Sequence, residues 1–94
     1  MVAVDRSKNR QPLEMKRPTL NSYIGARIRE RRLKLDLSQE QLAKALSVSQ
    51  QQIQNYEKGV NEIAAVRLFE ICRVLKLPLS TMFPPDDLEN EPPV

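Results

Sequence analysis

The chain has 94 residues, enough for one domain but not for a second domain with a core of its own. Its 15 Lys and Arg against 12 Asp and Glu give a net charge of +3, which suits a polyanionic partner as well as an ordinary solvated surface. With no His and one Cys it cannot assemble a zinc site, a disulfide framework or most catalytic triads, so we expect neither an enzyme nor a metal or other cofactor.

The two ends of the chain have compositions that disfavour a packed core. Residues 1–19 are basic and contain Pro12 and Pro18, which should interrupt any helix, and we interpret them as a flexible basic arm. Residues 84–94 combine proline with acidic residues and predict an acidic tail. The ordered domain is therefore expected over residues 20–83. No apolar run reaches the roughly 20 residues that span a bilayer, so we expect a soluble intracellular protein.

A first helix is predicted over about residues 22–35, where Ile24, Ile28 and Leu35 share one apolar face. Its other faces carry five basic side chains: Arg27, Arg29, Arg31, Arg32 and Lys34. These residues are either a solubilising surface or a set of phosphate contacts with one arginine reserved for a structural ion pair.

Two more helices follow closely. Ser38 and Gln41 have the spacing of a capping box, in which a hydroxyl and an amide satisfy backbone groups at a helix start. The buried side of that helix is supplied by Leu42, Ala43 and Leu46. Ser49 and Gln52 repeat the same box, which leaves residues 47–48 as a tight turn.

The third helix, over about residues 49–58, is expected to be amphipathic. At about 100° per residue, Gln50, Gln51, Gln54, Asn55 and Lys58 fan across an arc of roughly 140°, and Gln52 falls between this face and the opposite one, which carries Ile53 and Tyr56. Each amide offers a donor beside an acceptor, which matches the N6 and N7 atoms of adenine in the major groove. We therefore predict base contacts from Gln50, Gln51, Gln54 and Asn55, and favour this role over a merely soluble polar face.

The rest of the domain also has helical spacing. Gly59 is a natural end for the third helix. A mostly buried fourth helix is predicted from the spacing of Val66, Leu68, Phe69, Ile71, Cys72 and Leu75, and Pro78 ends it. One short closing helix with apolar residues over the core is predicted from Leu79, Met82 and Phe83. We expect Cys72 to pack in the core rather than to sense redox state. The predicted fold class is all-α.

The segment SQEQLAKALSVSQQQIQNYEKG, residues 38–59, resembles the helix-turn-helix of the Xre family, small five-helix DNA-binding domains of the phage lambda repressor and Cro type. It shares the opening Gln39, Ala43 at the close helix contact, the apolar positions and the closing Glu-x-Gly. The resemblance extends over about residues 23–83 and is greatest to short alphaproteobacterial regulators. It implies a compact five-helix lambda-repressor-like domain whose third helix enters the major groove of duplex DNA.

The resemblance also implies roles for single residues. Gln39 would contact a phosphate and brace Gln50, and backbone amides of residues 58–61 would hold another phosphate. Arg32 and Glu57 occupy the positions of the family's partly buried ion pair between the first and third helices. The expected phosphate contacts are Gln39, Arg27, Arg31, Lys58 and Asn61.

Three residues depart from the family's pattern. Ser47 and Asp36 stand where glycine is usual, so each must adopt a positive φ at some cost or alter its turn. Glu62 stands in a loop where related members tend to carry a basic residue facing the DNA backbone. A carboxylate there should repel phosphate and weaken binding.

The function implied is sequence-specific transcriptional regulation, with repression favoured, by a homodimer on a palindromic operator in the cytoplasm at the nucleoid. Leu79, Met82 and Phe83 are the expected dimer interface, and no membrane association is expected. Two alternatives stay open. One is a DNA-binding antitoxin or restriction-system controller, and the other is a protein-interaction module with vestigial DNA binding.

Overall fold

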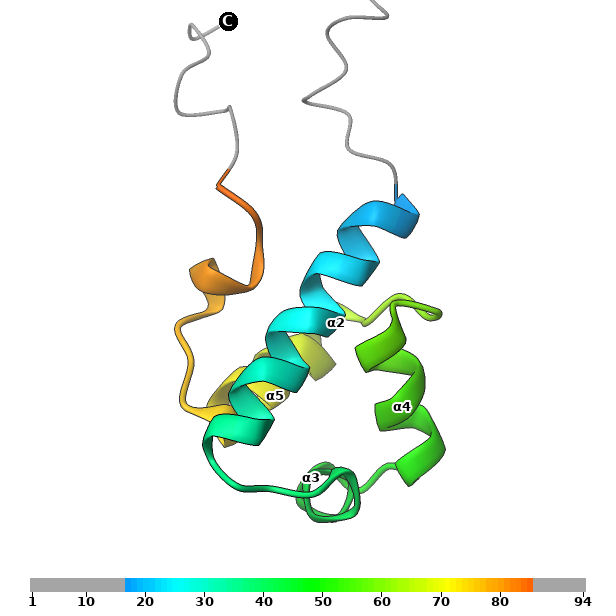
Figure 1. Ribbon diagram of the computed structural model, residues 1–94, viewed down its shortest axis with the longest axis vertical. Coiled ribbons are helices and arrows are strands. Elements are labelled where there is room, and N and C mark those ends of the chain that lie inside the picture. Colours follow the sequence, from blue (N-terminus) through cyan, green and yellow to red (C-terminus); the bar gives the residue numbers. More distant parts are fainter. Residues whose placement is uncertain (1–16, 86–94) are drawn as a thin grey trace, which may run out of the picture.

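Helices joined by short loops make up the residues that the computed structural model describes, 17–85. In chain order they are α2 (Arg17–Lys34), α3 (Gln39–Leu46), α4 (Gln50–Lys58), α5 (Ala65–Leu75) and the 3-10 helix η2 (Leu79–Met82) (Figure 1). The all-α prediction is confirmed. The fifth expected helix is a short 3-10 helix, so the described residues contain four α-helices and not five.

Helix α2 begins earlier than the predicted residue 22. Pro18 lies in its first turn, where a helix leaves backbone N–H groups without an intrahelical acceptor, so the missing N–H of proline removes no bond. The prediction that Pro18 interrupts the helix is therefore wrong. The rest of the expected basic arm, residues 1–16, and residues 86–94 of the expected acidic tail lie outside the described residues.

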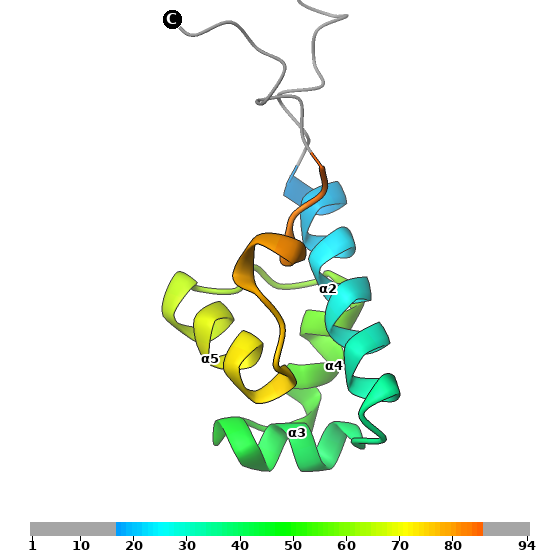
Figure 2. The same ribbon diagram turned by 90° about the vertical axis from the view of Figure 1, so that its left-hand side faces the viewer.

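The helices enclose one core. Helix α2 runs along the domain and packs against α4, α5 and η2, and α3 lies across the lower end of the domain in Figures 1 and 2. The core side chains come from every described helix: Ile24, Ile28, Leu42, Ala43, Leu46, Ile53, Tyr56, Leu68, Ile71, Cys72, Leu75 and Met82. Because α4 buries Ile53 and Tyr56 in this core, its opposite face is directed outward.

Two glycines let α2 pass close to α4 and to the residue that ends it. A Cβ at Gly25 would lie 2.6 Å from the carbonyl oxygen of Glu57, closer than real Cβ atoms approach. Gly59 ends α4 with φ 76°, and a Cβ there would lie 2.8 Å from the backbone nitrogen of Ser22. The position of α4 against α2 therefore depends on the absence of both side chains.

Three helices end in a left-handed residue that is not glycine. Asp36 and Ser47 have φ values of 60° and 59°, which confirms that both adopt a positive φ, and Lys76 has φ 57°. The N–H of Ser47 donates to the carbonyl of Lys44, at 3.2 Å. Such a conformation costs a residue with a Cβ about 1–2 kcal/mol.

Helix α5 is less buried than its apolar spacing predicts. Val66 and Phe69 were expected in the core, but they are 71% and 51% exposed. The buried stripe of α5 consists of Leu68, Ile71, Cys72 and Leu75. Val66 and Phe69 lie roughly 100° or more around the helix from the middle of this stripe, because each residue turns the helix by about 100°.

Candidate nucleic-acid interface

The start of α3 is fixed by the predicted capping box. The hydroxyl of Ser38 accepts from the backbone N–H of Gln41 at 2.9 Å, and the Gln41 side chain accepts from the Ser38 N–H at 2.7 Å. At α4 only half of the second box forms. Ser49 accepts from the backbone N–H of Gln52 at 3.0 Å, but the Gln52 side chain turns elsewhere. That part of the prediction is wrong, because partners at Tyr56 and Asn61 lie within its reach.

A buried ion pair holds α4 to α2. Arg32 donates from Nε and one terminal nitrogen to the two carboxylate oxygens of Glu57, at 2.6 and 3.0 Å. Its other terminal nitrogen donates to the carbonyl of Leu37 at 2.8 Å. The side chains of Arg32 and Glu57 are 8% and 3% exposed, so water screens the pair little. The predicted pairing is present, and it makes Arg32 unavailable to DNA.

Gln39 joins the same cluster from the first turn of α3. Its side-chain nitrogen donates to Glu57 at 3.0 Å, whereas the resemblance implied a bond to Gln50. A carboxylate only accepts, so the Gln39 amide must direct its nitrogen toward Glu57. Its oxygen and the second hydrogen on the nitrogen stay available. Gln39 is half-buried, and its bond to Glu57 places it against α4.

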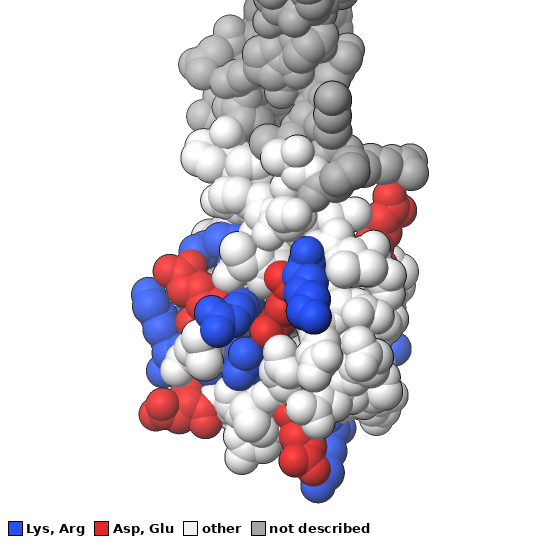
Figure 3. All heavy atoms as spheres, turned by 45° about the vertical axis from the view of Figure 1, so that its right-hand side comes forward, with Lys and Arg blue, Asp and Glu red and all other residues white. Residues whose placement is uncertain are grey.

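The outer face of α4 carries the four amides that the sequence singled out. Gln50 and Gln51 are exposed, and Gln54 and Asn55 are half-buried. Gln51 donates to the side-chain oxygen of Asn55 at 3.1 Å, one helical turn away. The side of α4 comes forward in Figure 3, where basic and acidic side chains are interspersed and a broad area carries neither charge. This face is therefore suited to directional hydrogen bonds more than to charge attraction.

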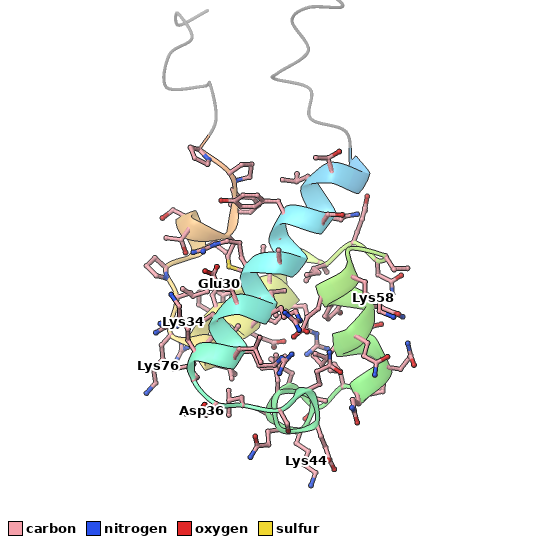
Figure 4. The ribbon with its side chains drawn as sticks, viewed as in Figure 1. Glu30, Lys34, Asp36, Lys44, Lys58 and Lys76 are labelled. Carbon is pink, nitrogen blue, oxygen red and sulfur yellow. The ribbon has the colours of Figure 1, made fainter. Side chains whose placement is uncertain are left out.

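The cationic and loop residues expected at phosphates divide into two groups. Lys58 is exposed at the end of α4, and Asn61 is half-buried just beyond it. Figure 4 shows Lys58 on the far side of α2 from Glu30 and Lys34. Lys58 therefore lies on the α4 side of α2. Asn61 lies against α4, where its side chain donates to Gln52.

Arg27 and Arg31 lie on the other side of α2. Arg27 donates to the carbonyl of Thr81 at 3.0 Å and pairs with Glu30 at 2.9 Å. Arg31 donates to the carbonyl of Leu75 at 2.9 Å. Both side chains thus join α2 to the C-terminal part of the domain. The structure does not bring them together with α4, and the resemblance gave no signal for this use.

Comparison with known proteins decides the family. A family model described as helix-turn-helix matches residues 28–82. The chain belongs to the Xre family of helix-turn-helix transcriptional regulators. This membership confirms the regulator class and the prediction that the chain is not an enzyme.

Several regulators are similar in sequence. An uncharacterized transcriptional regulator in the ATPase CF(0) region of Rhodospirillum rubrum is 45% identical over 74 residues, which cover 79% of this chain and 67% of that protein. An uncharacterized regulator of Sinorhizobium medicae is 45% identical over 80 residues, 85% of this chain and 52% of its own length. DicA of Escherichia coli is 39% identical over 81% of this chain and 57% of its own. The chain thus spans little more than half of several of these relatives.

Solved structures share the fold. The clp gene regulator ClgR of Corynebacterium glutamicum aligns with a TM-score of 0.66 at 25% identity, over 71% of each chain. The restriction-modification controller protein C.AhdI of Aeromonas hydrophila aligns with a TM-score of 0.63 at 25% identity, over 67% of this chain and 96% of its own. Both likenesses support the lambda-repressor-like arrangement of α2 to α5.

Other kinds of site find little support. Cys72 is 3% exposed, and burial raises the pKa of its thiol, which disfavours the reactive thiolate and agrees with core packing. Within residues 17–85, His, Cys, Asp and Glu form no group that could hold a metal ion. Each helix described over the same range is too short or too polar to cross a membrane.

Proposed function

We propose that this chain binds duplex DNA sequence-specifically by placing α4 in the major groove. The observation that carries the proposal is the separation of the side chains of α4 onto two faces. Its inner face is fixed by Ile53, Tyr56 and the buried pair of Glu57 with Arg32, and its outer face holds four amides. A rigid helix with directional donors and acceptors on its outer face meets the geometric requirement for reading base edges.

The proposed base contacts are Gln50, Gln51, Gln54 and Asn55. The proposed phosphate contacts are Gln39 at the start of α3, Lys58 at the end of α4 and Asn61 in the loop that follows. We leave Arg27 and Arg31 out of this set, because their guanidinium groups are bonded to backbone carbonyls on the opposite side of α2. Lys58 supplies positive charge near the groove, and the amides supply the discrimination.

Substitution of the amides tests the proposal. The wild-type chain first selects its preferred duplex from a random pool, and a scrambled duplex of the same length serves as the reference. Replacing Gln50 or Gln51 with Ala should cost about 1–3 kcal/mol on the selected duplex and leave the scrambled one almost unaffected. Replacing the exposed Lys58 with Ala should weaken binding to both duplexes. It should also reduce the slope of log affinity against log salt concentration by about one. An equal loss on both duplexes for the Gln50 and Gln51 variants would contradict base reading.

The proposal includes a homodimer that acts as a repressor at a palindromic operator in the cytoplasm, at the nucleoid. Leu79 and Phe83 are 44% and 41% exposed at the C-terminal end of the domain and are available to a partner. Met82 was expected beside them, but it is fully buried in the core and is removed from the interface. Sedimentation analysis should show a dimer that the double replacement of Leu79 and Phe83 with Ser converts to a monomer.

A restriction-system controller is a second candidate, favoured by the structural likeness to C.AhdI. Both candidates bind DNA through α4. The genes adjacent to this one distinguish them, since a controller should lie beside a restriction endonuclease and a methyltransferase gene.

A further inference from the structure

A side-chain bridge closes the loop after α4 onto α4 itself. The side-chain oxygen of Gln52, on the first turn of α4, accepts from the side-chain nitrogen of Asn61 at 3.2 Å. The nitrogen of the same Gln52 amide donates to the hydroxyl of Tyr56 at 3.1 Å. Tyr56 is buried, and Gln52 and Asn61 are half-buried. Gln52 therefore links a loop residue to a side chain that the core holds in place.

The backbone donors of this loop are unequally available. The N–H of Gly59 donates to the carbonyl of Tyr56 at 3.1 Å, and that of Val60 donates to the carbonyl of Asn55 at 3.0 Å. These bonds complete the end of α4 and leave neither group for a ligand. Within residues 17–85, Asn61 is the first residue after α4 whose backbone N–H has no acceptor. Of the donors expected at a phosphate in residues 58–61, the Lys58 side chain and Asn61 therefore remain.

We propose that Gln52 is a positioning residue, which holds Asn61 so that its backbone N–H and its remaining side-chain N–H donate to a DNA phosphate. This inference rests on the proposed DNA binding by α4. The residues of the loop belong to no helix, so without the bridge Asn61 would have to be ordered at the moment of binding, with a loss of conformational entropy. Gln52 removes part of that cost in the free protein, because its own partner Tyr56 is fixed in the core.

A double-mutant cycle on the full chain tests the coupling. Gln52→Met keeps a side chain of similar length without the amide, and Asn61→Ala removes the other partner. The probes are the duplex selected by the wild type and a scrambled duplex of the same length. Each single variant should lower the affinity for both probes by the same factor, about fivefold to tenfold. The double variant should bind no worse than the weaker-binding single variant. A loss that is equal on both probes is the signature of a phosphate contact, which a merely structural defect in the base-reading helix would not produce.

Tyr56→Phe is the matched control. It removes the hydroxyl that accepts from Gln52 but leaves the Gln52 to Asn61 bond, so its affinity for both probes should lie closer to that of the wild type than that of Gln52→Met. Far-UV circular dichroism and thermal unfolding verify that each variant is folded. If Gln52→Met does not fold, Gln52→Asn replaces it, because the shorter amide keeps its polarity but does not reach Asn61.

The outcomes separate the inference from the function it rests on. Additive losses in the double variant, or a Gln52→Met loss confined to the selected duplex, overturn the positioning role while DNA binding stands. A wild-type chain that binds neither probe overturns the proposed function and this inference with it.

Discussion

Replacing Arg32 with Met should destabilise the domain more than any change on its surface. Arg32 donates two hydrogen bonds to Glu57 and one to the carbonyl of Leu37. In the variant the Glu57 carboxylate, 3% exposed, keeps Gln39 as its one remaining side-chain donor among the described residues. An unpaired buried charge of this kind costs about 3–5 kcal/mol.

That cost is large for a domain of this size. Small domains have a total stability of about 5–15 kcal/mol, and each kcal/mol shifts their melting temperature by about 4–8 °C. We therefore expect thermal unfolding of Arg32→Met, followed by circular dichroism, to occur at least about 12 °C below the wild type. Arg29→Met is the matched control, because Arg29 is exposed on the same helix, and it should change stability by about 0.5 kcal/mol or less.

The double replacement of Arg32 and Glu57 with Met checks the physical reason. It removes both charges together, so much of the lost stability should return. The reasoning is refuted if the free energy of unfolding of Arg32→Met lies within about 1 kcal/mol of the wild-type value. A second refuting result is a variant that has the stability of the wild type but a lower affinity for DNA. The second result would transfer Arg32 from the core to the DNA surface.

Three further changes probe the backbone and the core. Gly25→Ala should lower stability by about 1–3 kcal/mol in urea unfolding, since the new Cβ overlaps the backbone of α4, whereas Ala26→Ser on the exposed face should have little effect. Ser47→Gly should raise stability by about 0.5–1 kcal/mol by relieving the left-handed strain, and Ser47→Ala, which keeps the strain, should give no gain. Cys72 should react slowly with a thiol reagent at pH 8 in the folded chain and rapidly in urea. Its raised pKa lowers the fraction of thiolate, and its burial limits access of the reagent. Equal rates in the two conditions would place the thiol at the surface.

Local patterns predicted the elements that depend on neighbouring residues. The capping box at Ser38, the end of α4 at Gly59 and the outward amides of α4 each follow from spacings of a few residues, and all three are present. The length of α5 was also predictable, but its burial was not. Apolar residues on most of the circumference of a helix mean that several of its sides could be buried. The helices that pack against it determine which side is buried. Val66 and Phe69 were assigned to the core for this reason.

The amino-acid sequence by itself determined the helical class, the order of the helices and the amide face, because helix periodicity and capping act over one or two turns. The tertiary structure decided the use of each long polar side chain. Arg27 and Arg31 donate to backbone carbonyls 54 and 44 residues away along the chain. The Gln52 side chain bonds to Tyr56 and Asn61 and not to the backbone at the start of α4. A guanidinium or amide group can reach several acceptors, and folding alone determines which of them lie within about 3 Å. Arg27 and Arg31, expected at phosphates, thus join helices of the fold, and Gln52, expected in a helix cap, bonds to Tyr56 and Asn61.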